Sequence, residues 1–110
     1  MELKRDKVDD INVLYMEGSL TVATAQDVFS HTVSLLEDGE KKFLLQMSAV
    51  EFIDSTGLGT IVRLSKRVRE AKGKLSLAEP QPKIREMFEL TRLDKIFPIY
   101  RTYEEALEAF

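Results

Sequence analysis

The spacing of apolar residues along the chain predicts four helices. In two long segments, apolar positions recur every three or four residues, as on the buried face of a helix, and Gly39 and Gly73 end these segments. A third helix is expected after Pro82, and Thr102 with Glu105 has the spacing of a capping box at the start of a fourth. The expected helices begin near residues 24, 57, 82 and 102.

Short apolar or alternating runs between these helices predict strands. Residues 43–45 form a continuous apolar run, which is typical of a strand covered on both faces, and helical segments on either side of it favour a parallel arrangement. Two runs near the N-terminus, joined by a polar link at 9–12, are expected to form an edge hairpin. Pro98 places the last run at a sheet edge or strand end. The expected strands are Leu3–Val8, Ile11–Met16, Phe43–Leu45, Leu75–Leu77 and Ile96–Tyr100.

This alternation predicts an α/β fold, in which a mixed, mainly parallel sheet of about four or five strands packs with about four helices. A chain of 110 residues has the length of one domain. At this size, folding buries roughly two-thirds of the surface that the unfolded chain exposes, which is enough for a single core. We therefore expect one domain over residues 1–110, and the spacing leaves the strand order open.

Composition excludes several classes of function. Sixteen Lys plus Arg against nineteen Asp plus Glu give a net charge of −3, the wrong sign for a protein that binds the phosphate backbone of nucleic acid. The absence of cysteine rules out disulfides, thiol redox chemistry and a Cys-ligated zinc site. A charged N-terminal segment, with no apolar stretch long enough to span a bilayer, predicts a cytoplasmic protein without a membrane partner.

The most distinctive motif is Asp54-Ser55-Thr56-Gly57-Leu58-Gly59, where an apolar run gives way to a helical pattern. Helix N-termini accommodate anionic groups, so Ser55 is a candidate phosphate acceptor. Capping alone also accounts for Asp, Ser and Thr at such a position, since these residues stabilise a helix start by about 1 kcal/mol. Each glycine costs about 1 kcal/mol relative to alanine, which implies a further role. Close approach of a partner to Ser55 and tight packing of the helix on the sheet are both open.

Residues 50–59 resemble the signature of the anti-sigma factor antagonists, the small bacterial members of the STAS domain family. Further matches, which extend the resemblance over almost the whole chain, are Met16–Leu20, Thr24–Ala25, Leu77–Pro80 and Leu93–Phe97. The resemblance implies the fold of that family, with Ser55 as the phosphorylated residue and Thr56 beside it as a supporting cap.

The resemblance also implies a mechanism without catalysis by this chain and without a cofactor. The unmodified protein would bind an anti-sigma factor and release a sigma factor. The anti-sigma factor, acting as a serine kinase, would phosphorylate Ser55 with ATP, and a serine phosphatase would reset the switch. The residues expected at the partner-binding surface are Asp54, Ser55, Thr56, Gly57, Leu58, Gly59, Thr21, Arg63 and Lys66.

Some of these positions have a second interpretation. Arg63, Lys66 and Arg67 would pair with an acidic partner or form an ordinary solvated face. Thr21 and Gln46 depart from the family pattern, since similar sequences often carry an acidic residue or asparagine there, and both are expected near the phosphorylation site. The terminal aromatic residues are expected either to form a dimer patch or to pack within the domain, so the oligomeric state is open.

Rival functions have weaker support. A hydrolase with Ser55 as nucleophile would need His31 as its base, but this single histidine falls on the polar side of a helix and no GxSxG elbow occurs. Neither a phosphate-binding glycine loop nor a His/Cys metal cluster is present in the sequence. The alternative that stays open is a STAS scaffold or sensor-complex module that does not switch, with or without nucleotide binding.

Overall fold

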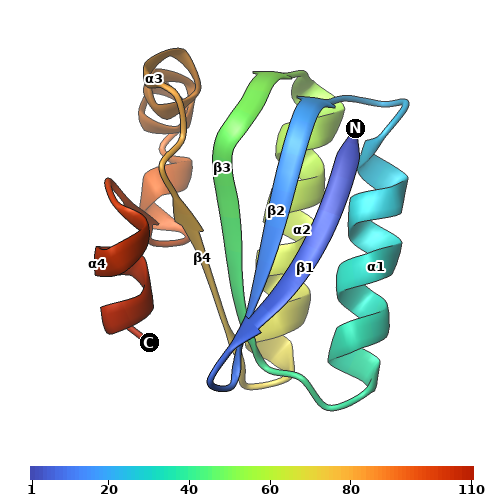
Figure 1. Ribbon diagram of the computed structural model, residues 1–110. Helices are drawn as coiled ribbons and strands as arrows, with labels where there is room; N and C mark the ends of the chain where they lie inside the picture. Colours follow the sequence, from blue (N-terminus) through green and yellow to red (C-terminus); the bar gives the residue numbers. More distant parts are fainter.

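The computed structural model describes residues 1–110 and contains one five-stranded sheet with helices on both faces (Figure 1). The strands are β1 (Glu2–Val8), β2 (Ile11–Leu20), β3 (Lys42–Ile53), β4 (Lys74–Ala78) and β5 (Ile99–Tyr100). The helices are α1 (Ala25–Glu37), α2 (Ser55–Glu70), α3 (Pro82–Leu90) and α4 (Tyr103–Glu108), with a 3-10 turn, η1, at Leu93–Lys95.

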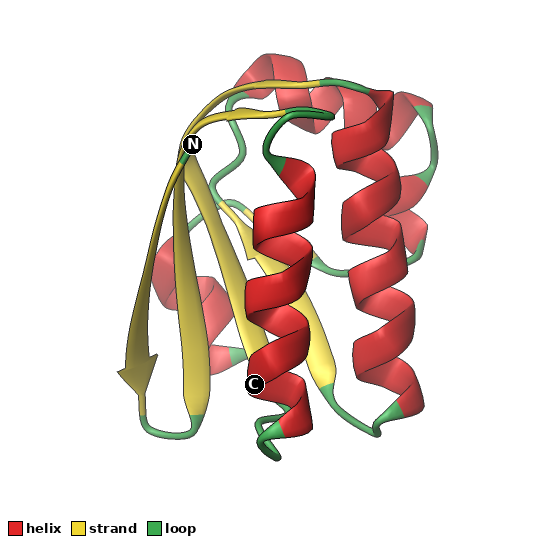
Figure 2. Ribbon diagram, turned by 90° about the vertical axis from the view of Figure 1, so that its right-hand side faces the viewer, coloured by secondary structure: helices red, strands yellow, loops and turns green.

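The strands lie side by side in chain order, β1-β2-β3-β4-β5. The β1–β2 pair is an antiparallel hairpin, whereas β2–β3, β3–β4 and β4–β5 are parallel. Helices α1 and α2 make the first two parallel crossovers and pack against each other along their length (Figure 2). Helix α3 with η1 makes the third crossover, from β4 to β5. The expected α/β fold with a mixed, mainly parallel sheet is therefore confirmed.

Two apolar clusters hold the layers together, one on each face of the sheet. Leu14 of β2 and Leu45 of β3 face the larger cluster, under α1, α2 and α3. Their neighbours Val13 and Leu44 face the smaller cluster, which α4 closes with Ala106 on the opposite side of the sheet (Figure 1). Because both faces of β3 are covered, its apolar run is continuous, as the sequence predicted.

Strands β2 and β3 continue well beyond their expected ends. The β2–β3 register shifts between Tyr15 and Glu17 and again between Gly18 and Ser19. As a result, the buried residues in the second half of β3 are Met47, Val50 and Ile53, spaced by three rather than two. This spacing imitates a helix and hides the strand from an analysis of alternation.

The last strand begins later than predicted. Leu93–Lys95 forms the 3-10 turn η1, and the Phe97 side chain is buried in the larger core cluster. Only Ile99–Tyr100 pairs with β4. The expected strand start at Ile96 was therefore wrong, because tertiary burial of Phe97 takes this segment out of the sheet.

None of the four helices combines the length and the apolar character needed to cross a bilayer.

Candidate functional site

Asp54 connects the end of β3 to the first residue of α2 and acts as the N-cap of that helix. One carboxylate oxygen, Oδ1, accepts the backbone N–H of Gly57 at 2.8 Å. The other oxygen, Oδ2, accepts the N–H of Val22 at 3.0 Å, and the Asp54 N–H donates to the Leu20 carbonyl at 3.2 Å. This residue therefore fixes the start of α2 to the segment that follows β2.

These contacts also set the charge at the site. The hydrogen bond from Gly57, with a second from Val22, lowers the pKa of the Asp54 carboxyl group below its ordinary value of 3.8. Asp54 is therefore ionised at neutral pH. The start of α2 already holds a negative charge, and that carboxylate takes the Gly57 N–H, which another anion would otherwise use.

The hexapeptide motif divides into exposed and buried positions. Ser55, Thr56 and Gly59 are exposed, and Leu58 is half-buried. Gly57 is buried. The hydroxyl-bearing side chains at the helix start are thus open to a partner, as a phosphate acceptor must be.

The two glycines of the motif differ in how closely other atoms approach them. A Cβ at Gly57 would be 2.2 Å from the Leu20 carbonyl oxygen and 3.0 Å from Cγ2 of Ile53. A Cβ at Gly59 would meet no atom within 4 Å. Gly57 therefore permits tight packing of α2 against the end of β2, while Gly59 leaves free space at the surface.

The segment between β2 and α1 lies beside the start of α2. Hydrogen bonds between its threonine side chains and its own backbone hold its conformation. Thr24 Oγ1 accepts the Thr21 N–H at 2.9 Å and donates to the Ser19 carbonyl at 2.7 Å. Thr21 Oγ1 accepts the Ala23 N–H at 3.3 Å. The structure thus brings Thr21 to the site, as expected. It also brings Val22, which sequence analysis missed because a lone apolar residue in a loop gives no periodic signal.

The sequence of this chain is similar to those of known proteins. A family model described as the STAS domain matches residues 2–106. The chain belongs to the STAS domain family. BtrV of Bordetella bronchiseptica, named as a candidate anti-sigma factor antagonist, is 30% identical over 110 residues, which cover 100% of this chain and 95% of BtrV. The family inferred from the motif is therefore confirmed.

Solved structures of other STAS proteins share the fold. A candidate anti-sigma factor antagonist of Thermotoga maritima superposes with a TM-score of 0.93 at 33% identity, over 97% of this chain and 92% of that one. SpoIIAA of Bacillus in its phosphorylated form gives a TM-score of 0.78 at 19% identity, over 98% of both chains. At that identity, the likeness to SpoIIAA concerns the fold alone.

The basic face of this STAS domain lies further along α2. Arg63 places its guanidinium 4.5 Å from the centroid of the Phe29 ring on α1 and donates to Thr60 Oγ1 at 3.3 Å. Lys66 and Arg67 are exposed beside it. Arg63 follows Ser55 by eight positions, which is roughly 12 Å along the helix axis, so this face lies near Ser55 without contacting it.

Gln46 does not lie where sequence analysis expected it. It occupies the middle of β3, opposite Tyr15 and Ala78, and lies seven positions before Ile53 at the end of the strand. That separation is roughly 23 Å of extended chain. Gln46 is buried and its Oε1 accepts the Ser48 N–H at 3.1 Å. The expected approach of Gln46 to Ser55 was wrong, because β3 is much longer than its apolar run.

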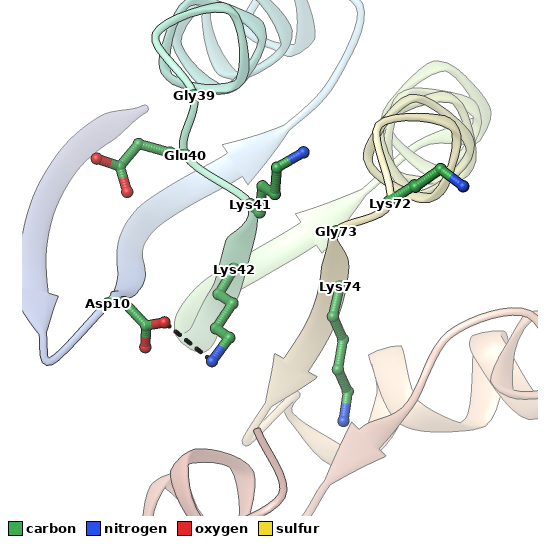
Figure 3. Close-up of a pocket in the computed structure, with 8 residues that line it drawn as sticks. All are labelled: Asp10, Gly39, Glu40, Lys41, Lys42, Lys72, Gly73 and Lys74. Atoms are coloured by element: carbon green, nitrogen blue, oxygen red, sulfur yellow. Dashed lines mark ion pairs between the residues drawn. The ribbon is translucent and has the colours of Figure 1, made fainter.

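A polar cavity of about 400 Å³ lies at the other end of β3 and β4 (Figure 3). Lys42 pairs with Asp10 at 2.9 Å, and Lys41 Nζ donates to the Ala71 carbonyl at the end of α2 at 2.6 Å. The cavity is also lined by Lys72 and Lys74. The Glu40 carboxylate turns away from these lysines toward β1, where Lys7 binds it at 2.7 Å. The ammonium groups of Lys41 and Lys42 therefore hold loops and a helix end in place.

Proposed function

We propose that this chain is an anti-sigma factor antagonist, which binds an anti-sigma factor while Ser55 is unmodified and so releases a sigma factor. The observation that carries the proposal is the exposed Ser55 at the start of α2, beside the ionised Asp54. The names of the relatives support it as well. In this role the chain is a regulator and performs no catalysis itself.

The switch operates by charge. The partner kinase transfers the terminal phosphoryl group of ATP to the Ser55 oxygen, the hydroxyl proton leaves, and ADP is released. The phosphate adds a charge of about −1.5 to −2. A serine phosphatase hydrolyses the ester and restores the hydroxyl.

The start of α2 offsets only part of this new charge. The Gly57 N–H is already bonded to Asp54, and none of the ion pairs of the structure involves a residue between 54 and 59. The Asp54 carboxylate repels the phosphate. A closely packed partner would have to desolvate the remaining charge, which costs more than a typical interface contact provides, so the complex dissociates.

The proposed partner surface combines the helix start with residues from two neighbouring segments. The hexapeptide Asp54 to Gly59 forms its centre, and Thr21 lies in the segment between β2 and α1, which is bonded to Asp54 through Val22. Arg63 and Lys66 lie further along α2, where they would meet acidic groups of the partner. Gly57 contributes from beneath, by allowing the helix to pack closely on β2.

The test uses the serine-kinase anti-sigma factors of the organism that encodes the chain, each purified and incubated with the chain and ATP. We expect one of them to bind the unmodified chain and to phosphorylate it, with peptide mass spectrometry locating the phosphate on Ser55. Ser55→Ala should bind without being modified, and Thr56→Ala should still be modified. Binding without any phosphate transfer would favour a non-switching scaffold, and modification elsewhere would refute the site.

A matched variant tests the charge mechanism. Ser55→Asp should bind the same anti-sigma factor at least tenfold more weakly than Ser55→Ala, because it places a carboxylate where the phosphate would stand. Isothermal titration calorimetry measures both affinities. Equal affinities of the two variants would reject the electrostatic switch.

A further inference from the structure

Val22 is a large apolar side chain left in water beside the phosphorylation site. Val22 is 73% exposed as a whole residue, whereas the apolar residues Leu20 and Ala25 near it in the chain are buried. A single exposed apolar residue is ordinary on a protein surface. Val22 differs from such residues because its backbone is hydrogen-bonded to the N-cap of the helix that carries Ser55.

The loop that presents Val22 is ordered before any partner arrives. Its four successive N–H groups from Thr21 to Thr24 all have acceptors within the chain. The Val22 N–H itself donates to Asp54 Oδ2 at 3.0 Å. A side chain on such a loop can be buried in an interface without a large loss of backbone entropy, which favours its use as a contact residue.

The position of Val22 also indicates which protein covers it in a complex. One carboxylate oxygen of Asp54 binds Val22 and the other binds Gly57, so the exposed valine and the exposed serine flank the same side chain. A protein that closes over the Ser55 hydroxyl therefore covers Val22 in the same contact. The Val22 side chain itself is apolar and carries no hydrogen-bonding group, so the partner needs an apolar pocket at this position.

We infer that Val22 is the apolar anchor of this interface, which inserts into an apolar pocket of the anti-sigma factor next to the groups that bind Ser55. This inference rests on the proposed function. Val22 sets affinity and partner choice, while Ser55 sets the state of the switch. The two residues therefore contribute through different physical effects, apolar burial and charge, and their contributions can be measured separately.

The test compares alanine variants at two residues that are almost equally exposed to solvent. Val22→Ala removes two buried methyl groups from the complex and should weaken binding of the purified anti-sigma factor roughly tenfold. Leu90→Ala is the control, because Leu90 is 77% exposed but lies at the end of α3. It should bind as the wild-type chain does, and both variants should unfold at the wild-type urea concentration.

Kinase kinetics give a second measurement. Val22→Ala should raise the KM for phosphorylation of Ser55 roughly tenfold and leave kcat unchanged, because it removes binding that is equal in the ground and transition states. Wild-type affinity and wild-type KM for Val22→Ala would overturn the anchor while the proposed function stands. Failure of the wild-type chain to bind any of the anti-sigma factors would instead refute the proposed function.

Discussion

Gly57 and Gly59 are two positions apart in the motif, but only Gly57 lacks room for a side chain. Gly59→Ala should raise the free energy of unfolding by up to about 1 kcal/mol, because alanine is the better helix former and the site has free space. Gly57→Ala should lower it by about 1–3 kcal/mol, since its Cβ would collide with the Leu20 carbonyl oxygen. Urea denaturation measures both changes, and a stabilised Gly57→Ala variant would contradict the packing role.

Asp54 gives the site a defined response to acid. Its pKa is lowered in the folded state, so the stabilisation that it provides is complete above its ordinary pKa of 3.8 and is lost as the pH falls through the lower folded value. The difference in unfolding free energy between the wild-type chain and Asp54→Asn should therefore be constant near neutral pH and shrink below about pH 4.

Chemical denaturation at a series of pH values tests this expectation. Other carboxyl groups with lowered pKa values, Asp10 and Glu40, are present in both chains, so their contributions cancel. A difference that stays the same from neutral pH to pH 3 would show that the charge of Asp54 has no part in holding the loop and the helix together.

Strand β4 contains a buried hydroxyl group that has no hydrogen-bond partner. Ser76 is fully buried on the strand, opposite Leu44 of β3, and its Oγ has no hydrogen-bond partner. Ser76→Ala should raise the free energy of unfolding by about 1 kcal/mol, because it removes an unsatisfied polar atom from the smaller core cluster. A thermal melt gives the direction, and a lowered melting temperature would mean that the hydroxyl finds a partner.

The elements also show how far the sequence could predict the structure. All four helices were predicted, because their apolar stripes are regular and Gly39, Gly73 and the Thr102 capping box mark their ends. Most of β3 was missed, since only Phe43–Leu45 of its 12 residues were expected as a strand, and the register shifts place the buried residues of its second half three apart. The start of α2 was predicted from local residue types, whereas the approach of Val22 to Asp54 depends on long-range packing, which no local pattern records.

The charge distribution of the molecule would favour one orientation of the proposed partner. The chain has a net charge of −3, yet the outward face of α2 carries Arg63 and Lys66. Lys66→Glu should slow association with the anti-sigma factor, and the difference from the wild-type chain should diminish as salt is added, because exposed charges are screened. Stopped-flow mixing measures the rates, and equal rates at low salt would assign this face to solvent alone.

The polar cavity of Lys41, Lys42 and Lys72 and the hydroxyl of Ser55 lie at opposite ends of the same parallel strands. Since the chain contains no cysteine, Lys72→Cys would introduce the only thiol. A fluorescent dye attached there would rotate with the domain, and its anisotropy would follow capture and release at the distant end without touching the regulated surface.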